Sequence, residues 1–107
     1  MLQLLSAVKL KSSVSETRFA EAIQKLGASL TQQQLLTSTG PIDKRYPHLV
    51  IDTGQTDLQT FFVMSFENGA RLKKKVAHMT GSENLSADIH RQIWGQLDRY
   101  RFTCWED

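Results

Sequence analysis

A run over residues 58–66, rich in apolar, aromatic and β-branched side chains, constrains the fold more than any other feature of the chain. Successive side chains of an extended strand point to opposite faces. Phe62 and Met64 would therefore lie on one face, and Phe61 and Val63 on the other. Because both faces are apolar, this strand is expected near the centre of a sheet.

The dipeptide Asn68-Gly69 follows this run and is the strongest hairpin signal in the chain, because both central residues of a type I′ turn adopt positive φ. We therefore predict a return strand over 70–78. On that strand Arg71, Lys73 and Lys75 would share one face, which would be almost wholly basic.

Two segments carry helical signals. Ser13 and Glu16 form a capping box, in which the serine hydroxyl accepts a hydrogen bond from a backbone amide and the glutamate reaches back to the cap. We predict a helix over 14–26, ended by Gly27, because glycine readily takes the left-handed conformation of a C-cap. Apolar residues at helical spacing predict a second helix over 85–100.

Segment 28–39 has two open interpretations. Its β-branched residues favour a strand, whereas a second capping pattern favours a helix, and a helix here would make 13–39 a helix-turn-helix. The other segments are expected as follows: a strand over 2–10, with a short helix as its alternative, a loop over 40–47, a strand over 48–53, and a short closing strand or coil over 101–105.

This order of elements predicts an α+β fold, a two-layer sandwich with a mainly antiparallel sheet and two helices packed on one face. The order permits a ferredoxin-like topology, but that fold hosts many functions and so transfers none. With 107 residues the chain suits a single domain, which we assign to 1–107.

Composition bounds the compartment and the partners. Cys104 is the only cysteine, so no intramolecular disulfide can form, and we expect a reducing, cytoplasmic location with a buried, structural thiol. No run approaches the roughly 20 apolar residues that cross a bilayer, so no membrane partner is predicted. The formal net charge of +2 is ordinary and does not by itself indicate nucleic-acid binding.

No catalytic signature occurs, because the sequence lacks a glycine-rich phosphate loop, a nucleophile elbow and a dinucleotide fingerprint. No catalytic residue and no cofactor is therefore assigned. His48, His78 and His90 lack the spacing of zinc ligands, so no metal is expected. Asp52 and Asp57 are interpreted as turn residues.

Two clusters are candidates for binding. Residues 71–75 form a basic strip that suits nucleic-acid phosphates, although lysines also protect sheet edges from aggregation, and we favour edge protection. Tyrosine, tryptophan and arginine, the usual anchors of protein interfaces, crowd the C-terminal region. We interpret most of these rings as core, with an interface as the alternative. The candidate binding residues are Arg71, Lys73, Lys75, Arg91, Trp94, Arg101 and Trp105.

The preferred hypothesis is a non-enzymatic binding or regulatory module that acts by protein–protein contact, through an open sheet face or the C-terminal region. A symmetric homodimer through the C-terminal aromatic residues is a separate prediction. The first alternative is a small nucleic-acid-binding protein that uses the 71–75 strip. The second alternative is a small RNA-cleaving or hydrolytic enzyme that uses His78 or His90.

Overall fold

The computed structural model describes residues 1–46, 57–81 and 85–107. Its elements, in chain order, are β1 (Leu2–Leu10), α1 (Glu16–Gln32), β2 (Ser38–Thr39), β3 (Asp43–Lys44), β4 (Thr60–Phe66), α2 (Gly69–Gly81), α3 (Leu85–Gln96) and β5 (Leu97–Glu106). The strand predicted over 48–53, with His48 and Asp52, lies outside the described residues.

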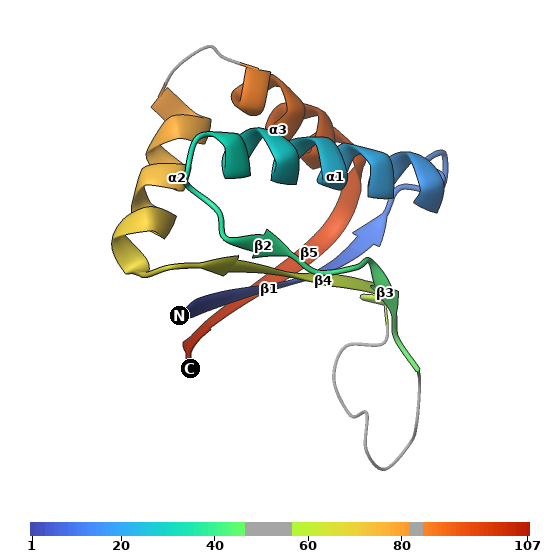
Figure 1. Cartoon of the computed structure of the whole chain (residues 1–107). Helices are drawn as coiled ribbons and strands as arrows, with labels where there is room; N and C mark the ends of the chain where they lie inside the picture. Colours follow the sequence, from blue (N-terminus) through green and yellow to red (C-terminus); the bar gives the residue numbers. More distant parts are fainter. Residues whose placement is uncertain (47–56, 82–84) are drawn as a thin grey trace.

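The described strands form one antiparallel sheet in the order β2-β4-β1-β5, and β3 also pairs with β4. In Figure 1 the labelled helices lie on one side of this sheet. The predicted two-layer α+β fold is confirmed, with α2 as a helix beyond the two expected. The strands expected over 2–10 and 58–66 are also confirmed, and the second lies inside the sheet, as its two apolar faces indicated.

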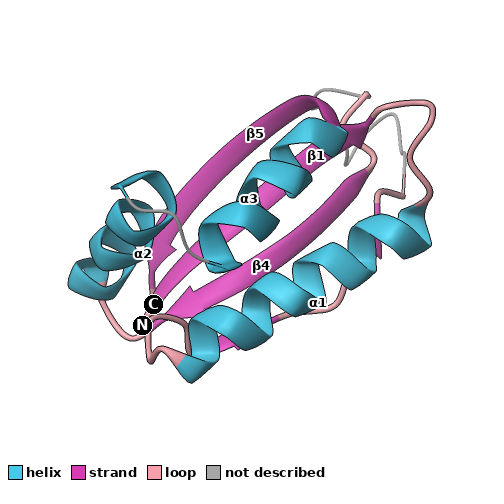
Figure 2. Ribbon diagram, turned by 90° about the horizontal axis from the view of Figure 1, so that it is seen from above, coloured by secondary structure: helices cyan, strands magenta, loops and turns pink. Residues whose placement is uncertain are grey.

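The core lies between α1 and the sheet. Figure 2 shows α1 and α3 over the sheet, running roughly along the strands. Burial along β4 alternates strictly, with Phe62, Met64 and Phe66 buried. Phe19 of α1 packs on Phe62 of β4, with ring centroids 5.9 Å apart. This packing anchors α1 over the centre of the sheet.

Helix α1 starts later and runs further than predicted. Its N-cap is Ser15, whose side chain accepts a hydrogen bond from the amide of Arg18, and not Ser13. The helix continues through Gly27 to Gln32, so the helix-turn-helix alternative is wrong. A Cβ at Gly27 would lie 2.7 Å from Oγ1 of Thr39, so the glycine permits close packing of β2 and does not end the helix. In the described ranges, no helix is both long and apolar enough to cross a membrane.

The predicted hairpin at Asn68-Gly69 is wrong, because this dipeptide starts α2. The side chain of Asn68 accepts a hydrogen bond from the amide of Arg71 at 3.1 Å, as an N-cap does. Gly69 does not have a positive φ, which a type I′ turn would require. The residues that follow are good helix formers. The basic return strand over 70–78 is therefore a helix.

The boundary between the last helix and the last strand lies earlier in the chain than predicted. Helix α3 ends at Gln96, and Leu97 to Tyr100, which were expected in its last turn, begin β5. The closing strand is confirmed but spans Leu97–Glu106, and it pairs with β1 over most of its length. A register shift between Lys9 and Leu10 marks where this pairing becomes irregular.

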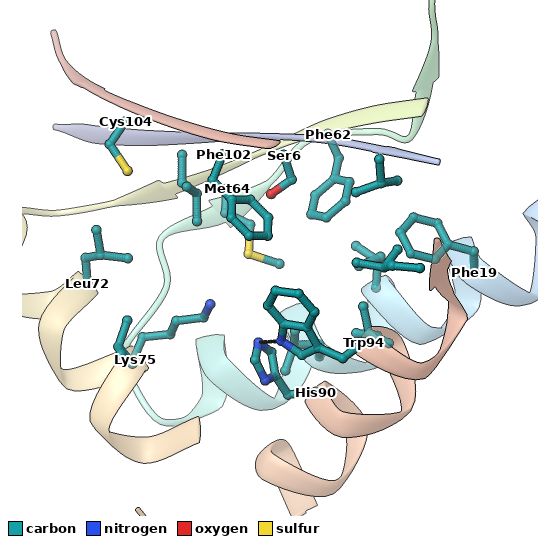
Figure 3. A pocket seen from close by; sticks show the side chains of 17 residues that line it. Ser6, Phe19, Phe62, Met64, Leu72, Lys75, His90, Trp94, Phe102 and Cys104 are labelled. Atoms are coloured by element: carbon teal, nitrogen blue, oxygen red, sulfur yellow. Dashed lines mark hydrogen bonds between the residues drawn. The ribbon is translucent and has the colours of Figure 1, made fainter. Parts of the chain in front are cut away.

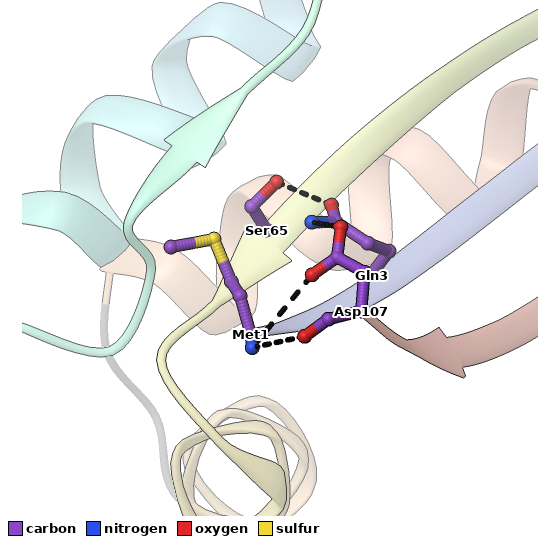
Figure 4. A network of polar contacts seen from close by, with 4 residues as sticks. All are labelled: Met1, Gln3, Ser65 and Asp107. Carbon is purple, nitrogen blue, oxygen red and sulfur yellow. Dashed lines mark hydrogen bonds and ion pairs between the residues drawn. The ribbon is translucent and has the colours of Figure 1, made fainter.

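The two ends of the chain meet beside the central strands (Figure 4). The amino group of Met1 donates to the backbone carbonyl of Asp107 at 3.1 Å. Gln3 donates to the Asp107 carboxylate at 3.1 Å and accepts from the hydroxyl of Ser65 at 2.5 Å. These contacts connect β1, β4 and β5 at one end of the sheet.

Candidate functional site

A cavity of about 560 Å³ lies between the helix-covered face of the sheet and the three described helices. Most of its lining is apolar, and every strand from the centre of the sheet to the β5 edge contributes to it. The labelled side chains in Figure 3 point into it from β1, β4, β5, α1, α2 and α3. Its lining residues are Leu4, Ser6, Val8, Phe19, Ile23, Leu26, Phe62, Met64, Leu72, Lys75, Val76, His90, Ile93, Trp94, Leu97, Phe102 and Cys104.

Among the described lining residues, Lys75 is the one strongly basic side chain. The 3.6-residue period of α2 turns Leu72, Lys75 and Val76 towards the sheet. Lys75 is only 9% exposed, and in Figure 3 its amine extends into the cavity. Among the described residues its amine has neither a hydrogen bond nor an ion pair. Burial lowers the pKa of Lys75, while the neighbouring Cys104 acts in the opposite direction.

His90 and Trp94 lie one turn apart on α3 and form a hydrogen-bonded pair. Nε1–H of Trp94 donates to Nε2 of His90 at 3.0 Å, and the two rings meet edge to face. Burial, and then the charge of Lys75, lower the pKa of His90 from 6.5 to about 4. The imidazole is therefore neutral at pH 7, and its proton is on Nδ1 because Nε2 accepts a hydrogen bond.

Two aromatic rings, Trp94 and Phe102, line the cavity near β5, and Tyr100 packs against both. Trp94 packs edge to face against Tyr100 at 4.4 Å and against Phe102 at 5.8 Å. Tyr100 and Phe102 stack at 5.3 Å, although they are 51% and 44% exposed. The expectation that most C-terminal rings complete the core is wrong for these two and for Trp105, which is 42% exposed.

Ser6 and Cys104 add small polar groups. Ser6 is buried in β1, where it pairs with Phe62 on one side and Phe102 on the other. Cys104 is exposed, so the expected buried thiol is wrong, although its side chain in Figure 3 faces the cavity. No aspartate or glutamate occurs among the described lining residues. Nowhere in the described ranges do three or more metal-ligating side chains cluster.

The predicted binding residues do not form one site. Only Lys75 and Trp94 line the cavity. Arg101 and Trp105 belong to β5, opposite Ala7 and Gln3 of β1, and therefore face away from the cavity. The other three lie outside the cavity lining. Arg71 forms an ion pair with Glu67 at 3.8 Å and Arg91 forms one with Asp88, while Lys73 is exposed.

Two further residues from the sequence predictions occupy structural positions. Asp57 lies in a turn, as predicted, and its carboxylate forms an ion pair with Arg99 of β5. His78 lies within α2 and not on a strand.

Sequence reasoning overlooked Ser6 and Phe102 as parts of a site. Ser6 is a lone hydroxyl within an apolar strand, and Phe102 alternates with Tyr100 and Cys104 on β5. A period of two over 97–106 would have placed these three side chains on one face. The helical interpretation of residues up to 100 concealed that alternation.

Together, the antiparallel sheet, its order and the helices on one face define a ferredoxin-like α+β fold. The Arabidopsis thaliana protein At3g17210 is similar, with a TM-score of 0.77 at 13% identity over 100% of this chain and 95% of its own. A dimeric ferredoxin-like protein of unknown function from Jannaschia sp. CCS1 has a TM-score of 0.72 at 13% identity, over 99% and 98% of the two chains.

A putative antibiotic biosynthesis monooxygenase from Nitrosomonas europaea shares the fold with a TM-score of 0.58 at 11% identity, over 100% of this chain and 98% of its own. No protein-family model and no curated protein matches this sequence. Identities this low establish the shared fold and leave the function to be argued from the site.

Proposed function

We propose that this chain binds a small, largely apolar organic molecule in the cavity between the sheet and the helices, and that the molecule carries one polar oxygen group. The observation that carries this proposal is the buried amine of Lys75, which extends into an apolar cavity of about 560 Å³ without a described partner. Ligand sites in proteins are typically apolar concavities of roughly 300–1,000 Å³ with a few convergent polar groups.

The charged side chains of the lining indicate which polar group the ligand carries. Lys75 supplies a donor, and no carboxylate occurs among the described lining residues. A buried polar group without a hydrogen-bond partner costs stability. A carbonyl, enol, phenol or carboxylate oxygen would satisfy the amine, whereas a second cation would be repelled.

The walls define the rest of the ligand. Phe62, Trp94 and Phe102 present ring surfaces to the cavity, and Met64 adds a polarisable thioether. Aromatic and sulfur-containing side chains pack well against flat rings. We therefore favour an aromatic or polyunsaturated ligand.

A hydrolytic role for His90 has less support. Its Nε2 already accepts the Trp94 hydrogen bond, and a pKa of about 4 makes the imidazole a weak base at neutral pH. Nucleic-acid binding also has less support, because the strand that would have aligned Arg71, Lys73 and Lys75 on one face is a helix with Lys75 buried.

Protein–protein contact remains a proposal, and we infer that the partner is a second copy of this chain. The sheet face away from the cavity carries Leu5, Val63 and Phe61 on adjacent strands. A dimeric protein of the same fold supports this choice. The cytoplasmic location and the single domain over 1–107 likewise remain predictions.

The test is calorimetric titration with two probes of the same shape, 2-naphthoate and naphthalen-2-ylmethanol. Both are expected to bind the wild-type chain. Lys75→Met should weaken naphthoate about tenfold or more, because a charge-assisted hydrogen bond contributes roughly 1.5–3 kcal/mol, and should spare the alcohol. Lys73→Met, on the exposed side of the same helix, is the matched control and should change neither affinity. Absence of binding of both probes to the wild type would overturn the proposal.

A further inference from the structure

We propose that Lys75 is a nucleophile that captures an aldehyde or ketone ligand as an imine inside the cavity. This inference rests on the proposed small-molecule site and narrows its ligand to carbonyl compounds with an apolar, ring-containing body.

The first support is the position of the amine. Lys75 is 9% exposed, its side chain runs from α2 into the cavity, and its nitrogen has no hydrogen-bond or ion-pair partner among the described residues. A buried ammonium is normally paired with a carboxylate. Because no acidic residue is part of the described lining, the ammonium form has nothing in this lining to stabilise it.

The second support is the electrostatic environment. His90 and Cys104 are the titratable groups of the described lining that face Lys75 from α3 and β5. Burial lowers the pKa of Lys75, and Cys104 opposes that shift without removing it. Only the free amine attacks a carbonyl carbon, and desolvation in an apolar pocket is one of the ways that proteins activate lysine for this chemistry.

The third support is the shape of the surroundings. The apolar walls around Lys75 include Leu72 on its own helix and Met64 and Phe102 on the sheet. These side chains offer apolar contact area to the body of a ligand. Bound in this way, a carbonyl group would be held near the amine, which replaces a bimolecular encounter by an intramolecular one.

The step balances without any other reactant. The nitrogen lone pair of Lys75 bonds to the carbonyl carbon to give a carbinolamine. The carbinolamine then loses the former carbonyl oxygen as water, together with the two protons that the amine brought. A C=N bond replaces the C=O bond, and nothing is oxidised or reduced.

The experiment uses naphthalene-2-carbaldehyde with sodium cyanoborohydride, which reduces an imine to a stable secondary amine. Intact mass spectrometry of the wild-type chain at pH 7 should show one reduced naphthylmethyl group per chain at early times. Peptide mapping should place it on Lys75. Lys75→Met should lose this early addition, whereas Lys73→Met should keep it.

The noncovalent probes separate the two possible failures. If naphthalen-2-ylmethanol binds the wild type but the aldehyde is not trapped on Lys75 faster than on exposed lysines, the imine proposal is overturned and the binding site stands. If neither the alcohol nor the aldehyde binds, the proposed function fails with it. A naphthylmethyl group mapped mainly to Lys73 or Lys74 also overturns the imine proposal.

Discussion

At the scale of single residues, burial of Lys75 lowers the stability of the fold and supplies a hydrogen-bond donor to the cavity. Its side chain is only 9% exposed between α2 and the sheet, and no described carboxylate lines the cavity that its amine enters. An apolar side chain of similar length would fill the same space without that cost. A lysine that a stable fold does not require, with its amine extending into an apolar cavity, is more simply explained by a ligand.

The first prediction follows from that cost. Lys75→Met should raise the free energy of unfolding by about 1–2 kcal/mol, because the variant keeps the side-chain volume and removes the unpaired amine. Urea unfolding followed by circular dichroism measures the change, with Lys73→Met as the exposed control. A destabilised Lys75→Met variant would mean that the amine has a stabilising partner in the native protein.

The second prediction concerns His90 and acid. The folded pKa is about 4 and the ordinary value is 6.5, so the unfolded chain binds this proton first as the pH falls. Stability supplied by the neutral imidazole is therefore complete above pH 6.5 and is lost progressively as the pH falls towards 4. After allowance for the partial exposure of the ring, the loss should be about 2 kcal/mol.

His90→Gln is the comparison for this effect, because a glutamine oxygen can accept the Trp94 N–H and does not titrate. Urea unfolding of both proteins at pH 7 and pH 4 gives the difference, and acid effects from all other groups cancel. The variant should lose less stability than the wild type. Equal losses in the two proteins would show that His90 titrates normally in the folded state.

At the scale of elements, the sequence patterns predicted helices and strands correctly where tertiary packing favours the same structure. The alternating apolar residues of β4 and the apolar character of β1 predicted both strands, and the buried positions Ile89 and Ile93 fit the predicted helix over 85–100. Asn68-Gly69 misled because asparagine serves both hairpins and helix N-caps. The helix is favoured over the hairpin by tertiary packing, because Leu72 packs against the core.

The candidate site was less predictable than the fold for a physical reason. Its lining comes from six elements, so it exists only once the helices have packed on the sheet. Lys75 and Trp94 were among the predicted binding residues, but Lys75 was placed on an exposed basic strand. Its burial follows from the helical period of α2, which the hairpin interpretation excluded.

The third prediction uses two helical glycines. Gly27→Ala should cost about 1–3 kcal/mol, because the new Cβ would lie 2.7 Å from the buried, unpaired Oγ1 of Thr39. Gly95→Ala should instead stabilise by about 1 kcal/mol, because no atom lies within 4 Å of its added Cβ and alanine favours helix. Thermal and urea unfolding of the two variants measure these opposite effects.

A double variant isolates the cause of the Gly27 effect. Thr39→Ala removes the clashing oxygen and breaks no hydrogen bond, so it should restore most of the stability lost in Gly27→Ala. No recovery in the double variant would mean that the helix needs glycine for its backbone and not for the approach of β2.

At the scale of the whole molecule, the two faces of the sheet have different surroundings. The cavity face is covered by α1, α2 and α3 (Figure 1). On the other face Leu5 pairs with Val63 of β4 and Ala7 pairs with Phe61 of β4, which forms an apolar patch on these two strands, and Thr103 of β5 lies beside Leu5. No described helix covers this patch. A two-fold axis would bring the same patch of two chains together, and two-fold symmetry is the commonest in homodimers.

The last prediction tests this dimer. In sedimentation velocity the wild-type chain should be dimeric at micromolar concentration, and Val63→Lys should be monomeric, because it places an unpaired charge at the centre of the patch. A buried, unpaired charge costs about 3 kcal/mol or more, which corresponds to a dissociation constant roughly 100-fold higher. Gln32→Lys, an equal charge change on the exposed end of α1, should remain dimeric. A wild-type chain that sediments as a monomer at all concentrations would contradict the dimer.

Naphthoate binding measured in the monomeric Val63→Lys variant would then establish whether one chain suffices to form the cavity, since every described lining residue belongs to a single chain.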